Sequence, residues 1–259
     1  MSESFNCAIL VNSCDKYYEA WHPFFLLLRK YWPNCKFDIY LNTESTICSE
    51  PGVKTLCTGH KEWSNRLADA IEQIDSEYIL FFLEDYFLQA QVDEKEFKRA
   101  EEILQDNKEI NAIYFKKITG HDSLSLEYPK FIEMDYSKKY ILNFQVGLWR
   151  RAKMLELIPR SLSAWQIEDN IVLSKNSGRF LCWAKGKYYD IQEDVFPYHW
   201  ALSQGFGIAK SNWLWNNRRL LKKEGLAYVK CKELHNMRKI EYILGGFVNR
   251  VHQNKGNNK

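Results

Sequence analysis

No apolar run in the sequence approaches the roughly 18 residues that a membrane-spanning helix needs. No basic stretch precedes the apolar residues of the N-terminal segment MSESFNCAIL, so that segment does not match a secretory signal peptide. From these two absences we expect a protein that is made and stays in the cytoplasm.

The signatures of several common enzyme classes are also missing. The chain has no G-x-G-x-x-G dinucleotide loop, no Walker phosphate loop and no G-x-S-x-G nucleophile elbow. Its seven cysteines form no C-x-x-C pair and no zinc-like spacing, and we expect them to be reduced and mostly buried. The net charge is only +3, so the composition gives no reason to expect nucleic acid as a partner.

What the sequence does contain is an alternation of strand and helix patterns over its first 85 residues. Such alternation is typical of an α/β protein with a Rossmann-type, mostly parallel mixed sheet and helices on both faces. Residues 78–83, YILFFL, are unbroken in their apolar character, which predicts a central parallel strand covered on both faces. Further strands are expected at 7–11, 36–42 and 52–57, and helices at 22–32, with Pro23 near its start, and at 64–74, with Ser64 as N-cap.

Patterns in the second half are less regular. Asp93 and Glu96 predict the start of a helix that runs to about Asp106. No repeat or linker interrupts the chain, so we expect one domain over residues 1–210 and a C-terminal helical extension over 211–259. The other expected elements are strands at 111–117 and 143–151, a polar loop at 119–139, helices at 151–159 and at 165–178 (stopped by Gly178), and a hairpin around Lys185 and Gly186.

Two acidic residues, Glu84 and Asp85, end the apolar strand. In open α/β sheets, ligands bind beyond the carboxyl ends of the strands, so we expect these carboxylates at the mouth of a crevice. Two carboxylates there suit a divalent cation, which in turn neutralises a diphosphate. The alternative is an ordinary solvated turn after a strand.

The segment from Trp63 to Leu88, WSNRLADAIEQIDSEYILFFLEDYFL, resembles the central block of the GT-A-fold glycosyltransferases. In that family a helix with Arg or Asn leads through an acidic turn and an apolar strand to a D-x-D-type motif. The N-terminal strand and loop, CAILVNSCD, are similar to the family's nucleotide-binding start, so the resemblance covers Cys7 to Leu88. It implies a GT-A-like fold and an inverting transfer of a sugar from a nucleotide-diphosphate donor, with a UDP-sugar favoured. The implied acceptor is a glycan or a lipid-linked saccharide in bacterial surface polysaccharide synthesis.

The resemblance also implies a set of donor-binding residues. The loop after the first strand would contact the base and ribose, and one face of the following central helix would line the nucleotide. For Arg66 and Asp69 on that helix, the alternative is an intrahelical ion pair on a solvated face. The implied donor set is Asn12, Ser13, Asp15, Arg66, Asp69, Glu84 and Asp85.

The acidic motif departs from the family pattern, because E-D-Y stands where D-x-D is expected. Metal dependence is therefore open. Asp85 keeps the metal-like position, and in many GT-A enzymes a late His or Asp completes the metal shell. By that resemblance Asp85 and His199 hold Mn²⁺ or Mg²⁺; the alternative for His199 is a packed histidine between Tyr198 and Trp200.

Residues 143–169 look like the acceptor half of such transferases. Gln145 and Trp165 are implied to bind the acceptor, Trp165 by stacking on its ring; the alternative for Trp165 is a place in the core. Glu168 or Asp169 is implied to be the general base that takes the proton from the attacking hydroxyl. We expect both acids in the first turn of a helix, where the dipole stabilises carboxylates, and that preference alone is the alternative explanation for them.

Two other functions are open from the sequence. A sugar nucleotidyltransferase shares the sheet, but it normally needs a glycine-rich loop after the first strand, and NSCDKYYEAW has no glycine. A catalytically inactive carbohydrate- or nucleotide-binding protein of the same fold is the non-enzymatic alternative, and the incomplete acidic motif gives it some weight.

The C-terminal extension interleaves Trp, Leu and Tyr with many Lys and Arg, against only three acids after residue 210. A basic amphipathic segment of this kind is able to lie on an anionic membrane. Peripheral contact with the inner face of the cell membrane would suit a lipid-linked acceptor. The alternative is a helix that packs its apolar face on the main domain.

Overall fold

The structure is a computed structural model that describes residues 5–185, 191–199, 208–209, 212–213 and 224. Most of the predicted extension, residues 211–259, lies outside these ranges, so its helical, amphipathic character stays a prediction. Among the described residues, no helix is both long enough and apolar enough to cross a bilayer.

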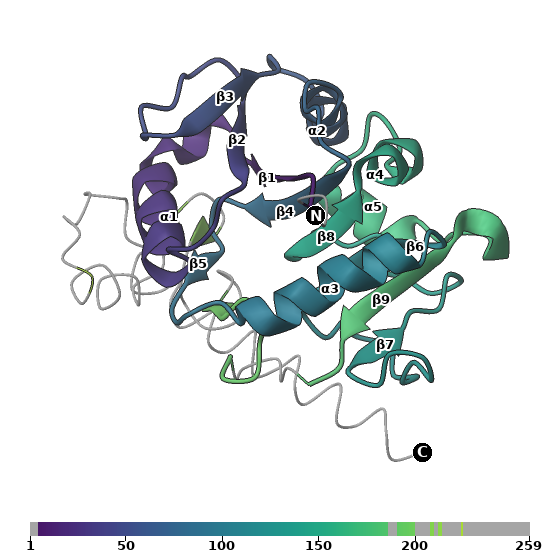
Figure 1. Cartoon of the computed structure of the whole chain (residues 1–259). Coiled ribbons are helices and arrows are strands. Elements are labelled where there is room, and N and C mark those ends of the chain that lie inside the picture. The colour runs from purple at the N-terminus through teal and green to yellow at the C-terminus, as the bar shows by residue number, and fades with distance from the viewer. Residues whose placement is uncertain (1–4, 186–190, 200–207, 210–211, 214–223, 225–259) are drawn as a thin grey trace, which may run out of the picture.

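One mixed sheet of eight strands forms the centre of the molecule (Figure 1). Its strands are β1 Cys7–Asn12, β2 Asp38–Thr43, β3 Val53–Cys57, β4 Tyr78–Leu83, β6 Ile110–Tyr114, β7 Phe131–Glu133, β8 Gly147–Arg150 and β9 Arg179–Trp183. They lie in the order β3-β2-β1-β4-β8-β6-β9-β7. The pairs within β3-β2-β1-β4 are parallel, as is β6 with β9, whereas β8 runs antiparallel to β4 and β6, and β7 antiparallel to β9. The parallel half has the strand order of a Rossmann-type nucleotide-binding unit.

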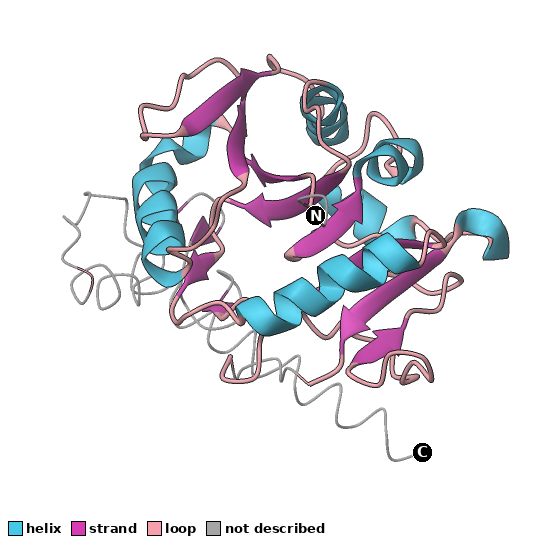
Figure 2. Cartoon of the chain, in the orientation of Figure 1, coloured by secondary structure: helices cyan, strands magenta, loops and turns pink. Residues whose placement is uncertain are grey.

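Helices cover both faces of this sheet (Figure 2). They are α1 Tyr18–Tyr31, α2 Trp63–Glu72, α3 Glu94–Asp106, α4 Arg151–Leu157 and α5 Ala164–Asn170. Successive strand residues point to opposite faces, so Ile9 packs in the core under α1 and α3, and Leu10 in the core under α2, α4 and α5. The predicted α/β class with helices on both faces is confirmed.

Strand β4 has the predicted bounds and is buried on both faces. It is central, between β1 and β8, but parallel only to β1. The predicted central strand covered on both faces is thus confirmed, and its β8 neighbour is one of the antiparallel strands of the mixed sheet.

Helix α1 begins at Tyr18, so Pro23 lies inside the helix and does not mark its start. A 3₁₀ turn, Asp15–Tyr17, leads into it. The earlier start buries Ala20 and Trp21 in the core, and this apolar contact favours the added turn despite the proline.

Ser64 is not the N-cap of α2, because the helix begins one residue earlier and Glu62 takes that position. The Ser64 hydroxyl instead accepts a hydrogen bond from the Leu162 backbone N–H at 3.0 Å, and the Ser64 N–H donates to the Leu162 carbonyl at 3.1 Å. Ser64 therefore ties α2 to the chain just before α5. At α3, by contrast, Asp93 caps the helix by accepting from the Glu96 N–H, as predicted.

The helix predicted at 165–178 is shorter than expected. Helix α5 ends at Asn170, and the Leu173 N–H donates to the Tyr136 carbonyl at 2.8 Å instead of continuing the helix. A 3₁₀ turn, Lys175–Ser177, follows, and Gly178 ends that turn with a φ of 89°, a left-handed value that glycine adopts without strain.

Two further predictions near the far edge of the sheet need correction. The expected polar loop 119–139 contains β7, whose Phe131 and Ile132 are buried. Strand β9 pairs with β6 at one edge and β7 at the other, so neither edge is open for the hairpin expected around Lys185 and Gly186. Residues 186–190 of the expected hairpin lie outside the described part of the chain.

Two small sheets lie outside the main one. Strand β5, Phe87–Leu88, pairs with β10, Tyr198–His199, and so brings β10 back to the end of β4. Strands β11, Ile208–Ala209, and β12, Asn212–Trp213, pair across the predicted domain boundary at residue 210, which stays a prediction.

Glu224, in the predicted extension, contacts the C-terminal end of α1. Its carboxylate accepts a hydrogen bond from the Tyr31 hydroxyl at 2.9 Å and forms an ion pair with Lys30. Burial and this carboxylate raise the pKa of Tyr31 to about 12. The extension therefore contacts the main domain at Glu224.

Candidate functional site

A buried chain of polar side chains joins the carboxyl ends of β1, β2 and the segment after β3. The Asn42 amide donates to Asn12 Oδ1 at 2.6 Å, and the Thr58 hydroxyl donates to Asn42 Oδ1 at 2.8 Å. The Asn42 amide also donates to the Arg66 carbonyl at 3.2 Å. Because buried polar groups need partners, this network fixes the strand ends relative to α2.

The loop after β1 is held mainly through Ser13. The Ser13 N–H donates to the Asn42 carbonyl at 3.0 Å, and the Ser13 hydroxyl accepts from Trp21 Nε1 at 2.8 Å. The Ser13 carbonyl accepts from the guanidinium of Arg66, which is buried. Arg66 Nε is buried too and finds no hydrogen-bond partner among the described residues. A buried cation with a spare donor therefore lies at the strand ends.

Glu84 is buried at the carboxyl end of β4, and its pKa is raised to about 8. Loss of hydration is the main cause, and the charge of Asp85 adds to it. The Glu84 N–H, the charge of Arg66 and the Ser13 hydroxyl stabilise the carboxylate and oppose the rise. The structure thus brings together Ser13, Arg66 and Glu84, three residues of the predicted donor set.

Asp85 is half-buried at the rim of the same strand end. No group of three or more His, Cys, Asp or Glu side chains within the described ranges is arranged to hold a metal ion. The backbone of His199 pairs with Phe87, two residues beyond Asp85, but the His199 side chain lies outside the described part of the structure. The Mn²⁺ or Mg²⁺ site of Asp85 and His199 therefore stays a prediction.

A hydrogen-bonded path joins this strand end to Glu168. Tyr86 follows Asp85 directly, and its hydroxyl donates to the Phe144 carbonyl at 3.0 Å. The Phe144 N–H donates to Glu168 Oε1 at 2.8 Å. The backbone of Phe144 therefore binds both Tyr86, the residue that follows the donor acids, and Glu168, a predicted catalytic base.

Glu168 is a weaker acid than usual. Burial raises its pKa to about 7, the neighbouring Asp169 adds to the rise, and the Phe144 N–H opposes it. Neither acid lies in the first turn of α5, which was the expectation. A capping box of Ser163 and Gln166 starts the helix at Ala164, so Glu168 and Asp169 fall near its C-terminal end, where the dipole does not favour negative charge.

Gln145 lies beside the same cluster. Its Oε1 accepts a hydrogen bond from the Tyr198 hydroxyl at 2.7 Å, and the Val146 N–H donates to that hydroxyl at 3.3 Å. The Tyr198 ring stacks on Tyr86 with centroids 4.6 Å apart. Gln145, Tyr86 and Glu168 are thus gathered around the 144–146 segment.

Trp165 is 64% exposed at the start of α5, so it is not part of the core. Asp169 is half-buried on the same helix. The Trp165 side chain is therefore accessible from solvent, and its contact with an acceptor stays a prediction.

Two residues of the predicted donor set have carboxylates that bind other parts of the chain. Asp15 accepts hydrogen bonds from the Ser45 hydroxyl at 2.6 Å and from the backbone N–H groups of residues 44–46. Partial burial works against ionisation, but these bonds hold the pKa of Asp15 below its usual range. Asp69 pairs with Lys61 at 2.5 Å and Arg160 at 3.0 Å, and not with Arg66 as the alternative interpretation had it. Donor contact by Asp15 and Asp69 stays a prediction.

Several residues at the site were not found from the sequence. Asn42 and Thr58 complete the network under the donor loop, and Tyr86 and Tyr198 connect the acids to Gln145. Each looked like an ordinary strand-end or core residue, and only the folded chain shows what it contacts. The one available signal was the position of Tyr86 directly after the acidic pair.

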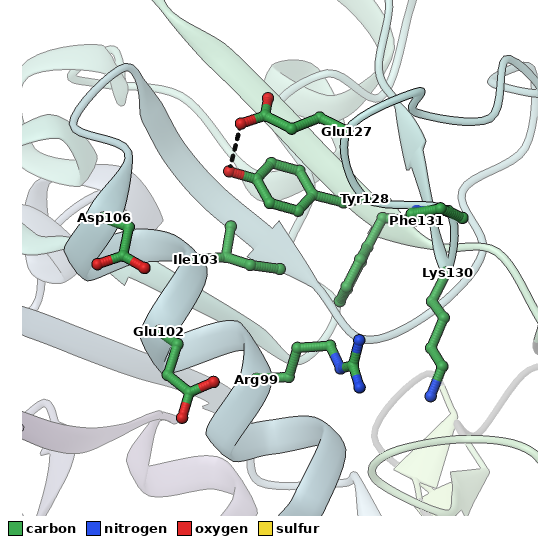
Figure 3. Close-up of a pocket in the computed structure, with 9 residues that line it drawn as sticks. Arg99, Glu102, Ile103, Asp106, Glu127, Tyr128, Lys130 and Phe131 are labelled. Carbon is green, nitrogen blue, oxygen red and sulfur yellow. Dashed lines mark hydrogen bonds between the residues drawn. The ribbon is translucent and has the colours of Figure 1, made fainter.

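A cavity of about 250 Å³ lies elsewhere, between the C-terminal half of α3 and residues 127–131 (Figure 3). Its floor is apolar, from Ile103 and Phe131, and its rim carries charges of both signs. Tyr128 in its wall donates to Glu127 at 2.8 Å. None of the predicted site residues lines this cavity.

No protein-family model and no curated protein matches the sequence. The chain is similar in fold to Staphylococcus aureus TarS 1–349 in complex with UDP-GlcNAc, with 13% identity, a TM-score of 0.40, and coverage of 70% of this chain and 60% of TarS. It is also similar to the Pyrobaculum calidifontis mannosyltransferase in complex with GDP-Man and Mn²⁺, with 10% identity and a TM-score of 0.43. That match covers 70% of this chain and 57% of the mannosyltransferase. The cytidylyltransferase IspD of Francisella tularensis matches with 12% identity and a TM-score of 0.37, over 58% of this chain and 75% of IspD. The match thus spans less than two thirds of TarS and of the mannosyltransferase, and these likenesses concern the fold alone.

Proposed function

We propose that this chain is a glycosyltransferase that moves a sugar from a nucleotide-diphosphate donor to a saccharide hydroxyl with inversion. The observation that carries the proposal is the link from the strand-end acids Glu84 and Asp85, through Tyr86 and Phe144, to Glu168. An inverting transfer needs a donor diphosphate site and a general base on the opposite side of the anomeric carbon. The link supports both groups belonging to one site.

The donor half of the proposal is supported by the polar floor at the ends of β1 and β4. Asn12, the last residue of β1, and Ser13, the first residue after it, are assigned to the base and ribose. The buried Arg66 offers a positive charge and a spare N–H donor, which suit a phosphate oxygen. Asp85, with Mn²⁺ or Mg²⁺ held also by His199, is assigned to the diphosphate; the cation would offset the charge of the leaving nucleotide.

Glu168 is the proposed base. A pKa of about 7 leaves much of it ionised at neutral pH while keeping it basic enough to take a proton, which is the range in which general bases work best. The Phe144 N–H holds Oε1, so Oε2 is the oxygen that we assign to the acceptor hydroxyl. Asp169, half-buried next to it, is the other candidate.

We assign the acceptor to the surface between Gln145 and the exposed Trp165, where the indole ring stacks on a sugar face. The proposed acceptor is a glycan or lipid-linked saccharide of surface polysaccharide synthesis. A cytoplasmic enzyme with its basic extension on the inner face of the membrane would reach a lipid-linked acceptor.

Donor binding is tested by thermal shift with UDP, GDP and their sugar conjugates, with and without Mn²⁺. We expect stabilisation by at least one nucleoside diphosphate, and a loss of that stabilisation in Arg66→Met. The matched control is Arg160→Met, which removes a cation that pairs with Asp69 on the outer side of α2. Equal stabilisation of wild type and Arg66→Met would contradict the donor assignment.

A further inference from the structure

An ion pair outside the predicted site set is buried next to it. Lys116 follows the end of β6, Asp194 precedes β10, and their charged groups are in contact. Both residues are buried. Burial lowers the pKa of Lys116, and the charge of Asp194 opposes that shift. Taking two charges out of water is costly, so a buried pair is weak evidence for a role in stability alone.

Asp194 begins the segment that returns the chain to the strand-end acids. In residues 194–199, which we call the bridging segment, the Val195 carbonyl accepts from the Asp93 N–H at 2.9 Å and the Pro197 carbonyl from the Gln89 N–H at 2.9 Å. Between them Phe196 packs against Phe82 at a centroid distance of 5.5 Å. The bridging segment is therefore fixed across the ends of the central strands, with Asp194 at its start.

Tyr198 is the residue through which the bridging segment meets the site. The Lys116 ammonium lies 4.8 Å from the centre of the Tyr198 ring. The same ring stacks on Tyr86, and the Tyr198 hydroxyl donates to Gln145 and accepts from the Val146 N–H. Lys116 of the ion pair thus contacts Tyr198. Tyr198 in turn holds Tyr86, which follows Asp85, and the predicted acceptor residue Gln145.

We propose that Lys116 and Asp194 are positioning residues, whose ion pair fixes the bridging segment so that Tyr198 holds Tyr86 and Gln145 in their working positions. The strength of an ion pair and of a cation–π contact depends on where the charges and the ring lie, whereas hydrophobic packing is not directional. The kinetic consequence rests on the proposed glycosyltransferase function. The geometric consequence does not, so the two are testable separately.

The main test is the double variant Lys116→Met/Asp194→Leu, which replaces the pair by apolar side chains of similar shape. Single substitutions remove one charge of a buried pair and are expected to destabilise the fold strongly, whereas joint apolar replacement is often tolerated. The matched control is Lys130→Met/Glu96→Leu, which removes an ion pair between α3 and the residue just before β7 and leaves Lys116 and Asp194 in place. Asp194→Glu keeps both charges but displaces the carboxylate. This variant replaces the double variant in the test if the double variant does not fold.

Amide hydrogen exchange gives the readout that does not depend on activity. We expect at least tenfold faster exchange at Gln89 and Val146, whose N–H groups donate to the bridging segment, and unchanged exchange at Leu10 in β1. The control variant should leave Gln89 and Val146 as in the wild type. Unchanged protection at Gln89 and Val146, or a uniform change at all three amides, would overturn the positioning role.

With an active donor and acceptor pair, kcat of the double variant is expected to fall at least tenfold while the Kd for UDP stays within twofold. Full kcat in a folded double variant would overturn the proposal. If the wild type neither binds nor turns over any sugar nucleotide, the proposed function fails, and hydrogen exchange still decides whether the pair positions the bridging segment.

Discussion

Glu168 accepts a 2.8 Å hydrogen bond from the Phe144 N–H, which fixes one carboxylate oxygen of the proposed base. Replacing Glu168 by Gln keeps an oxygen in that bond but removes the basic group. We expect kcat to fall about 100-fold or more, with donor Kd nearly unchanged, because a general base contributes roughly 10²–10⁴ to the rate. The kcat of each protein is measured from the rate of nucleoside diphosphate release in the presence of acceptor.

Asp169→Asn is the matched control for Glu168→Gln, because it changes the adjacent carboxyl in the same helical turn. It should retain most of the turnover. A large loss in Asp169→Asn with full activity in Glu168→Gln would move the base to Asp169, and full activity in both would place it elsewhere.

The raised pKa of Glu168 predicts how rate and stability depend on pH. Transfer should rise with pH through an inflection near 7, as Glu168 loses its proton. Because the folded pKa lies above the unfolded value of about 4.3, the protonated form favours folding below that value, and this contribution is lost as pH rises through 7. Glu168→Gln should therefore lack the inflection near pH 7 in its transfer rate. Its free energy of unfolding, relative to that of the wild type, should rise on the order of 2 kcal/mol from pH 5 to pH 8. Chemical denaturation at the two pH values checks the second point; a constant difference between the two proteins would contradict it.

Asp85→Asn tests the proposed diphosphate and metal position. The residue is half-buried at a strand end, so we expect the fold to remain intact and transfer to fall on the order of 10²–10³-fold, as when a charge-stabilising group is lost. Circular dichroism serves as the folding control. Near wild-type transfer by the variant would refute the role of Asp85, whereas EDTA without effect on wild-type turnover would refute only the metal.

The basic extension makes a separate prediction about membranes. Binding to anionic liposomes should be detectable at low salt, weaken with added salt and fall when residues after Ser211 are deleted, because each Lys or Arg near the surface adds about 1 kcal/mol. Liposome flotation measures it. Absence of flotation at low salt would leave the extension as a packing element, in line with the contact of Glu224 with Tyr31, and would favour a soluble acceptor.

The sequence predicted the parts of the fold that depend on local pattern. Strand β4 has its predicted bounds because a short, unbroken apolar run rich in aromatic and β-branched residues fits a strand that is covered on both faces. Helix α5 was predicted too long because its end depends on the Leu173 N–H meeting Tyr136, a contact that no local pattern shows. Strand β7 was missed because a short edge strand in a polar stretch has little apolar periodicity.

The candidate site divides in the same way. Glu84, Asp85 and Arg66 were predicted because a strand end and a helix face are visible in the sequence. Lys116 and Asp194 were not, because they lie 78 residues apart and each looks like an ordinary surface charge until the bridging segment folds back. The dipole argument for Glu168 failed because α5 begins one residue earlier than predicted, with Ser163 as its cap, and ends at Asn170, so that Glu168 lies near its C-terminal end.

The proposed transfer is tested most directly by incubating the full chain with sugar nucleotides and Mn²⁺ or Mg²⁺ and measuring the nucleoside diphosphate released. We predict slow release from at least one sugar nucleotide, faster release when a saccharide acceptor is added, a product of inverted anomeric configuration by NMR, and loss of release in Asp85→Asn. No release from any sugar nucleotide would contradict the account and favour a binding protein of this fold. Pyrophosphate released from a nucleoside triphosphate and a sugar phosphate would contradict it in favour of a nucleotidyltransferase.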